Sequence, residues 1–237
     1  MRSHPPTLPL HEETVQILQR YNVAQAHNLV YTYEELKDLG VQPEFLLALL
    51  EVFEDRQSFK PEGFNRFSLG VIVDYLRKTH TYYLNKKLLE IEQSIHLLVN
   101  AYPSAHPLLL LLHDFYVDYK SHLIKHIDME ERELLPYIVH LEQMAEGKGA
   151  LATASTITVQ QFIDQHHDTE KDLEEVRNAI LHYSPPTTNQ TLYRILLSQL
   201  QVFEKDMEVH ALMEDDVLLP RALELEKKFM DSSHRRG

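Results

Sequence analysis

Two stretches of eleven residues share one pattern, His-x-x-x-Glu followed by an acidic residue, two further positions and then Leu-Leu-Pro. They run from His126 to Pro136 and from His210 to Pro220. On a helix, residues four apart lie one above the other, so each stretch offers an imidazole nitrogen and a carboxylate to one point. The repeat therefore favours a fold in which two helices bring these points together.

Apolar residues recur at helical spacing through most of the chain. Few β-branched runs alternate, and there are only six glycines, so the sequence predicts an all-α fold. Short connections between long helices favour antiparallel neighbours, and hence an up-down four-helix bundle. The four long helices are expected to begin near Ser68, near Pro107, after a loop at 146–156, and near Thr191.

Polar groups interrupt the apolar stripes of all four long helices. A lone histidine, His80 or His166, replaces an apolar residue on the first and third helices. The second and fourth helices carry the two His-x-x-x-Glu pairs, which suggests two helical hairpins related by a pseudo-twofold axis. Burying a carboxylate among leucines is costly unless a positive charge compensates it, and no Lys or Arg shares these stripes near the pairs. A metal ion is the simplest compensating charge.

The candidate metal ligands are therefore four imidazoles and two carboxylates. Such a set suits first-row transition metals better than Mg²⁺ or Ca²⁺. The favoured hypothesis is that the site binds two iron ions, with zinc or manganese as alternatives. The six candidates are His80, His126, Glu130, His166, His210 and Glu214.

Composition excludes several other classes of protein. The chain has no cysteine, so it has no disulfide and no Cys-ligated metal or cluster. Its formal net charge of −13 argues against a nucleic-acid partner, because such binding rests on Lys and Arg. The N-terminus lacks the apolar run of a signal peptide, and Leu108 to Leu112 is too short to span a membrane. The expectation is a cytoplasmic protein without a membrane partner; its oligomeric state stays open.

A small helical subdomain is expected to precede the bundle. Short helical patterns at Thr14 to Tyr21, Tyr33 to Leu39 and Pro43 to Phe53 are followed by a linker-like stretch, Asp55 to Asn65. The predicted organisation is an N-terminal subdomain at 1–60 and a four-helix bundle at 65–230. Because this subdomain carries no predicted ligand, a chain that begins near Asn65 is expected to keep its metal and helicity.

The two motifs resemble those of the hemerythrin-like (HHE cation-binding) family, and most closely its iron–sulfur-cluster repair di-iron branch. The likeness rests on His126 to Pro136 and His210 to Ala222, and it covers about 65–226. It implies that His126, Glu130, His210 and Glu214 are metal ligands, with both carboxylates bridging the ions.

The other two histidines are assigned from weaker likenesses. Phe162 to His166 is similar to a family ligand pattern that selects His166 over His167, and helical periodicity agrees. Asp74 to Thr81 is similar to a stretch that often ends in two histidines, the second being the usual ligand. Here that second position is Thr81, so His80, which lies on the core stripe, is the predicted ligand.

The N-terminal stretch Gln19 to His27 is similar to the leading domain of the repair branch, but the paired cysteines of that domain are missing. A thiol-dependent step is therefore not expected. The resemblance implies a non-haem di-iron protein of the nitric-oxide or oxidative-stress response, with damaged iron–sulfur proteins as partners. One alternative is a carrier or sensor of O₂ or NO. A second is a di-iron oxidase or peroxidase, although a metal-binding stress-response protein is favoured over a classical enzyme.

Overall fold

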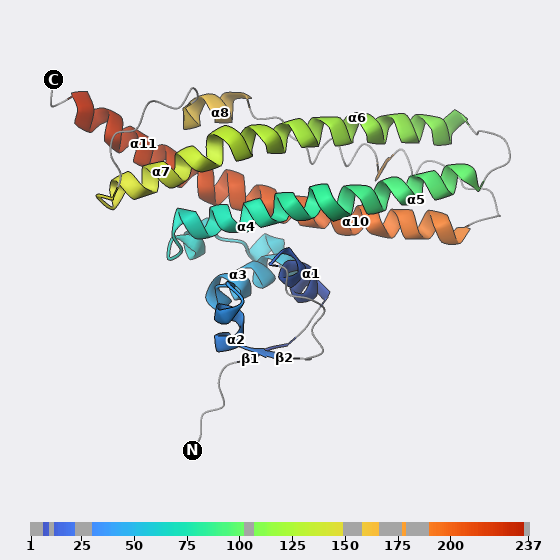
Figure 1. Cartoon of the computed structure of the whole chain (residues 1–237), viewed down its shortest axis with the longest axis horizontal. Coiled ribbons are helices and arrows are strands. Elements are labelled where there is room, and N and C mark those ends of the chain that lie inside the picture. The colour runs from blue at the N-terminus through green and yellow to red at the C-terminus, as the bar shows by residue number, and fades with distance from the viewer. Residues whose placement is uncertain are drawn as a thin grey trace, which may run out of the picture.

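The structure, a computed structural model, describes residues 7–9, 12–21, 30–101, 107–148, 158–165, 177–178 and 190–234. The predicted all-α class is confirmed: helices make up nearly all of its regular structure (Figure 1). The exception among the described residues is one antiparallel pair of three-residue strands, β1 (Thr7–Pro9) and β2 (Val30–Thr32). Among the described helices, none is both long enough and apolar enough to cross a membrane.

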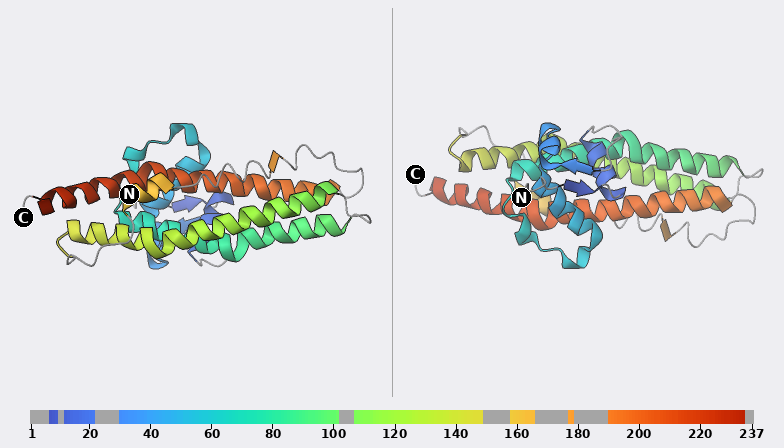
Figure 2. Two further views of the ribbon diagram at one scale, coloured as in Figure 1. Left: turned by 90° about the horizontal axis from the view of Figure 1, so that it is seen from above. Right: turned by 90° about the horizontal axis from the view of Figure 1, so that it is seen from below.

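Three long helical rods lie side by side (Figures 1 and 2). Each consists of two α-helices joined by a π-helical turn, which keeps the rod continuous. The first rod runs opposite to the other two, as an up-down bundle requires. Their parts are α4 (Leu69–Tyr82), Tyr83–Lys87 and α5 (Leu88–Asn100); α6 (Pro107–Met129), Glu130–Leu134 and α7 (Leu135–Ala145); and α10 (Gln190–Ala211), Leu212–Leu218 and α11 (Leu219–His234).

The predicted third bundle helix is described only in part. Its start is α8 (Val159–Gln165), which packs on α11. A buried carboxylate fixes this contact, because Glu226 accepts hydrogen bonds from the backbone N–H of Val159 (3.0 Å) and the hydroxyl of Tyr137 (2.8 Å). α8 is thereby fixed against α7 and α11.

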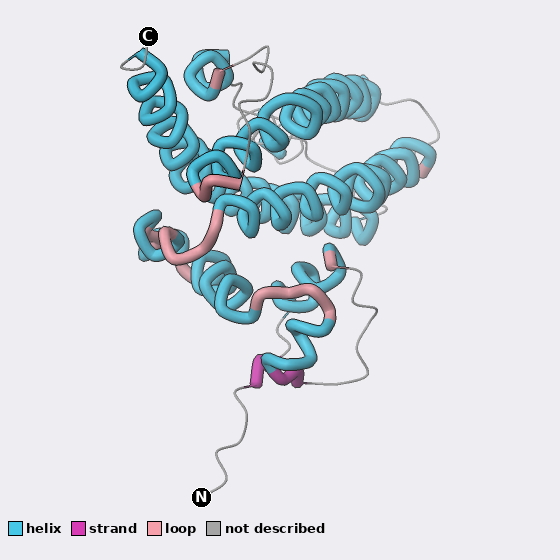
Figure 3. The backbone as a smooth tube through the Cα atoms, turned by 60° about the vertical axis from the view of Figure 1, so that its left-hand side comes forward, coloured by secondary structure: helices cyan, strands magenta, loops and turns pink. Residues whose placement is uncertain are grey.

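The N-terminal helices pack against one flank of the bundle (Figure 3). Local capping explains where several of them begin. Thr32 and Glu35 form a reciprocal capping box at the start of α2, and Pro43 opens α3 where its missing N–H is harmless. The linker-like stretch folds into two 3₁₀ turns. The bounds are α1 (Glu12–Arg20), α2 (Tyr33–Asp38), α3 (Pro43–Glu54) and the 3₁₀ turns Arg56–Ser58 and Pro61–Phe64.

Within the described part of the chain, buried apolar side chains form two clusters. The subdomain-side cluster joins the N-terminal helices to α4, α7 and α11, with Phe45 and Tyr75 in edge-to-face contact inside it. The distal cluster joins α5, α6 and α10 around Tyr116 and Phe203. The predicted domain boundary near residue 60 stays a prediction, but residues on both sides of it share the first core.

Candidate metal centre

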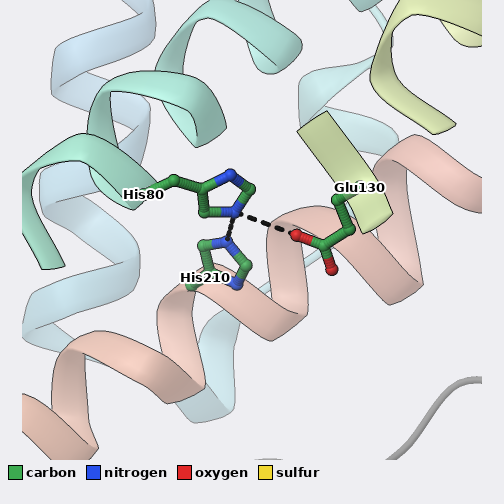
Figure 4. A group of neighbouring side chains, drawn as sticks. All are labelled: His80, Glu130 and His210. Atoms are coloured by element: carbon green, nitrogen blue, oxygen red, sulfur yellow. Dashed lines mark hydrogen bonds and ion pairs between the residues drawn. The ribbon is translucent and has the colours of Figure 1, made fainter. Parts of the chain in front are cut away.

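Side chains from three rods meet at the first group of potential ligands (Figure 4). His80 comes from the end of α4, Glu130 from the π-helical turn after α6, and His210 from the end of α10. The Nε2 atoms of His80 and His210 lie 2.9 Å apart. An oxygen of Glu130 lies 3.1 Å from Nε2 of His80. One ligand atom from each residue falls within 4.8 Å of the others, which is the spacing a single bound cation needs.

A second group shares Glu130 with the first. It contains His126, Glu130 and Glu214, again with ligand atoms within 4.8 Å of one another. The other oxygen of Glu130 lies 2.5 Å from Nε2 of His126. Glu130 thus has one oxygen toward each group, while Glu214 also lies 3.9 Å from Nδ1 of His210. Two adjoining cation sites with a shared carboxylate are what a dinuclear centre requires.

The site lies at the border between the two apolar clusters. Glu130, Glu214, His80 and His210 are each at most 5% exposed. Neither oxygen of Glu130 receives a hydrogen bond of good geometry, although imidazole nitrogens lie close to both. A buried carboxylate in this condition is costly, and a cation would relieve that cost. The two groups offer three imidazole nitrogens and three carboxylate oxygens, a mixed donor set that fits a first-row transition metal.

The charges of the site depend on one another. Burial alone would lower the pKa of His80, but the close carboxylate of Glu130 and the hydrogen bond to Glu131 raise that pKa to about 9. Burial alone would raise the pKa of Glu130, yet His126 and His80 hold it far below its usual value. Burial and the neighbouring His80 lower the pKa of His210 well below the ordinary range. In the metal-free chain, a protonated His80 partly supplies the positive charge that a metal would bring.

The π-helical turns coincide with the ligands. Glu130 opens one, Glu214 lies inside another, and the third begins three residues after His80. In the second and third rods a proline follows closely, Pro136 and Pro220. Proline lacks an N–H, and its ring clashes with the carbonyl four residues earlier, which a wider turn accommodates. The Leu-Leu-Pro ending of both motifs therefore favours the wide turns that carry the carboxylates.

A carboxylate that the sequence analysis did not single out orients His80. Glu131 accepts a hydrogen bond from Nδ1 of His80 (2.7 Å), and Arg77 lies 3.3 Å from the other Glu131 oxygen. Metal-bound imidazoles usually donate their second N–H in this way, which leaves Nε2 facing the metal. Thr81, by contrast, is exposed and donates its hydroxyl to the carbonyl of Arg77 (3.0 Å). The only sequence signal for Glu131 was its place directly after Glu130.

Five of the six predicted ligands therefore come together: His80, His126, Glu130, His210 and Glu214. The sixth, His166, lies outside the described residues, as does His167. The structure places Glu130 in both groups and Glu214 in one, whereas the resemblance implied that both carboxylates bridge. His122, one turn before His126, is exposed, so it does not join the clustered imidazoles.

Comparison with known proteins places the chain in a family. Residues 71–222, more than half of the chain, match the family described as hemerythrin HHE cation binding domain. The chain belongs to this hemerythrin family. The matched segment contains all five clustered side chains.

Several relatives are named as iron-sulfur cluster repair proteins. ScdA of Staphylococcus haemolyticus is 26% identical over 113 residues, which cover 48% of this chain and 49% of the relative. ScdA of Staphylococcus epidermidis is 22% identical over 168 residues, 71% of each chain. YtfE of Pectobacterium carotovorum is 33% identical over 103 residues, which cover 44% of this chain and 42% of the relative. The aligned part thus spans about half of the first relative.

Proposed function

We propose that the chain is a non-haem di-iron protein that acts in iron–sulfur cluster repair within the nitric-oxide or oxidative-stress response. The observation that carries the proposal is the pair of ligand groups sharing Glu130, one with His80 and His210 and the other with His126 and Glu214. His166 would add a donor to one of them. Zinc and manganese remain competitors, because the ligand set alone does not choose among these metals.

The repair role is supported by the names of the relatives and by the kind of site. Bound iron would supply redox chemistry and an affinity for small diatomic ligands such as O₂ or NO. The side chains of this chain hold the charge, orient His80 through Glu131 and surround the site with apolar packing that limits water. Since the sequence has no cysteine, repair would have to proceed by delivery of iron rather than by thiol chemistry.

The test begins with protein produced in iron-replete medium and purified without oxygen. Elemental analysis is expected to give about two iron ions per chain, with little zinc or manganese. Trace metal alone would end the di-iron proposal.

The repair role is tested separately, with a [4Fe–4S] dehydratase that has lost activity through cluster damage. The iron-loaded protein should restore dehydratase activity anaerobically, and its own iron content should fall in proportion. Metal-free protein and an equal amount of free ferrous iron are the controls. Iron that stays bound after exposure to NO, with no recovery of the dehydratase, would favour the carrier or sensor instead.

A further inference from the structure

A cationic side chain from the N-terminal subdomain is buried inside the bundle. Arg20, the last residue of α1, is 5% exposed, and its partner Asp206 on α10 is 1% exposed. Nη2 of Arg20 donates to both carboxylate oxygens of Asp206, each at 2.5 Å. A buried arginine is stable only when paired in this manner, so the contact requires α1 to lie directly against the bundle.

The same guanidinium also contacts α4. Nη1 of Arg20 donates to the hydroxyls of Thr79 (2.9 Å) and Tyr75 (3.0 Å). Its carbon lies 5.5 Å from the ring centre of Tyr75 and 5.3 Å from that of Tyr82. One planar group therefore holds α4 and α10 at a fixed separation, since its fork geometry allows little adjustment.

The two anchoring points lie next to potential metal ligands. Thr79 precedes His80 directly, and Asp206 lies one helical turn before His210. These are the two imidazoles whose Nε2 atoms approach to 2.9 Å across the same pair of helices. The separation of α4 and α10 at Arg20 thus sets the separation of His80 and His210.

From this geometry we infer that Arg20 is a positioning residue of the metal centre: by bracing α4 against α10 it holds His80 and His210 at the spacing that binds one of the two ions. The inference rests on the proposed metal-binding function. It makes the N-terminal subdomain part of the centre, although that subdomain contributes no ligand.

The test is a cobalt(II) titration of metal-free protein, followed by optical absorption, which reports both affinity and coordination. Arg20→Met should weaken binding of one ion by about 10- to 100-fold, the range typical of groups that orient ligands, and should change its spectrum. Arg20→Lys, which keeps the charge but loses the fork, should fall between this variant and the parent protein. Gln19→Ala is the matched control, because it removes a hydrogen bond between α1 and Lys86 (2.7 Å) without touching the brace.

Arg20→Met leaves Asp206 buried without its cation, so folding is separated from positioning by a second variant. Arg20→Met combined with Asp206→Leu removes both charges and should regain thermal stability. It should nevertheless bind one cobalt ion as weakly as Arg20→Met does. Parent-like affinity in this double variant would overturn the inference, as would parent-like affinity in Arg20→Met. A parent protein that binds no cobalt would instead refute the metal-binding proposal itself.

Discussion

Among the clustered side chains, Glu130 is the one that faces both groups of potential ligands. Its two oxygens point to different imidazoles, His80 and His126, and the carboxylate is 1% exposed. Glu214 belongs to one group and lies near His210 of the other. The two carboxylates occupy equivalent places in the sequence repeat, but they are not equivalent in space.

Glu130→Ala should therefore abolish binding of both ions. The substitution removes a donor from each group and leaves the mutual repulsion of two cations less screened. Metal analysis is expected to find near-zero content for Glu130→Ala and reduced content for Glu214→Ala. Glu133→Ala, on the same turn but exposed, should keep both ions. Full occupancy in Glu130→Ala would show that this carboxylate is not a ligand.

The ligand on the third helix stays a prediction from the sequence alone. His166→Ala should lower metal content toward one ion per chain, because an imidazole nitrogen binds a single metal. His167→Ala, displaced by one residue around the helix, should retain two. The reverse pattern in the metal analysis would transfer the assignment to His167 and leave the rest of the site unaffected.

At the scale of elements, both carboxylates of the site lie in π-helical turns. A π-helical turn accommodates one more residue than an α-helical turn, so it rotates every side chain that follows it. In Glu130–Leu134 the widened turn is closed by a hydrogen bond from the N–H of Leu135 to the carbonyl of Glu130, directly before Pro136. The missing N–H and the ring of Pro136 disfavour an α-helical hydrogen bond to the carbonyl of Arg132, within the same widened turn.

Pro136→Ala should consequently raise helix propensity and weaken the metal site together. Alanine is favoured over proline inside a helix by about 3 kcal/mol, so the metal-free protein should melt no lower than the parent. Closure of the α-helical turn would rotate the residues after Glu130, including Glu131, which orients His80, and metal content should fall. Pro43→Ala, at the first position of α3, is the control expected to keep both ions. Unchanged metal content in Pro136→Ala would mean that metal binding does not depend on the wide turn at Glu130–Leu134.

A structural feature could be predicted from the sequence when the residues that form it lie close together along the chain. The helices and the His-x-x-x-Glu pairs are visible because their periodicity involves neighbours three or four residues apart. The π-helical turns leave no such signature, and the strands β1 and β2 are too short to show alternation. Arg20 and Asp206 are 186 positions apart in the sequence. In the sequence alone, each of them is indistinguishable from an ordinary surface charge. No Lys or Arg shares the ligand stripes themselves, and Arg20 reaches the bundle from α1, where no stripe indicates it.

For the molecule as a whole, the metal centre lies where the subdomain-side cluster meets the distal cluster. Removing the metal leaves the buried carboxylates of Glu130 and Glu214 without a compensating cation, which lowers the free energy of unfolding. Chelation should therefore destabilise the entire fold. At ligand concentrations about 100-fold above the dissociation constant, binding contributes about 2.7 kcal/mol, or roughly 5–10 °C in melting temperature for a chain of this size. Calorimetry before and after chelation measures the shift. An unchanged melting curve in protein verified as metal-free would argue against a buried site.

The N-terminal subdomain gives the last test at this scale. The sequence suggested that a chain beginning near Asn65 would keep its metal and helicity, but the structure gives reasons for a different result. Such a chain lacks the subdomain side of a shared core, including Phe45 against Tyr75, and leaves Asp206 buried without Arg20. Breaking a buried ion pair from one side typically costs about 3–5 kcal/mol, which is a large part of the stability of an ordinary domain.

The shortened chain is therefore expected to melt well below the full chain and to lose metal. Adding Asp206→Leu to it should recover part of the melting temperature, because the unpaired charge is then gone. The remaining decrease in melting temperature would come from the apolar face of α4 that the truncation exposes. Thermal unfolding followed by circular dichroism, with metal analysis of the same samples, distinguishes the two contributions. Equal melting temperatures for the full and shortened chains would mean that the contacts across residue 60 contribute little to stability, and that the bundle folds as an independent unit.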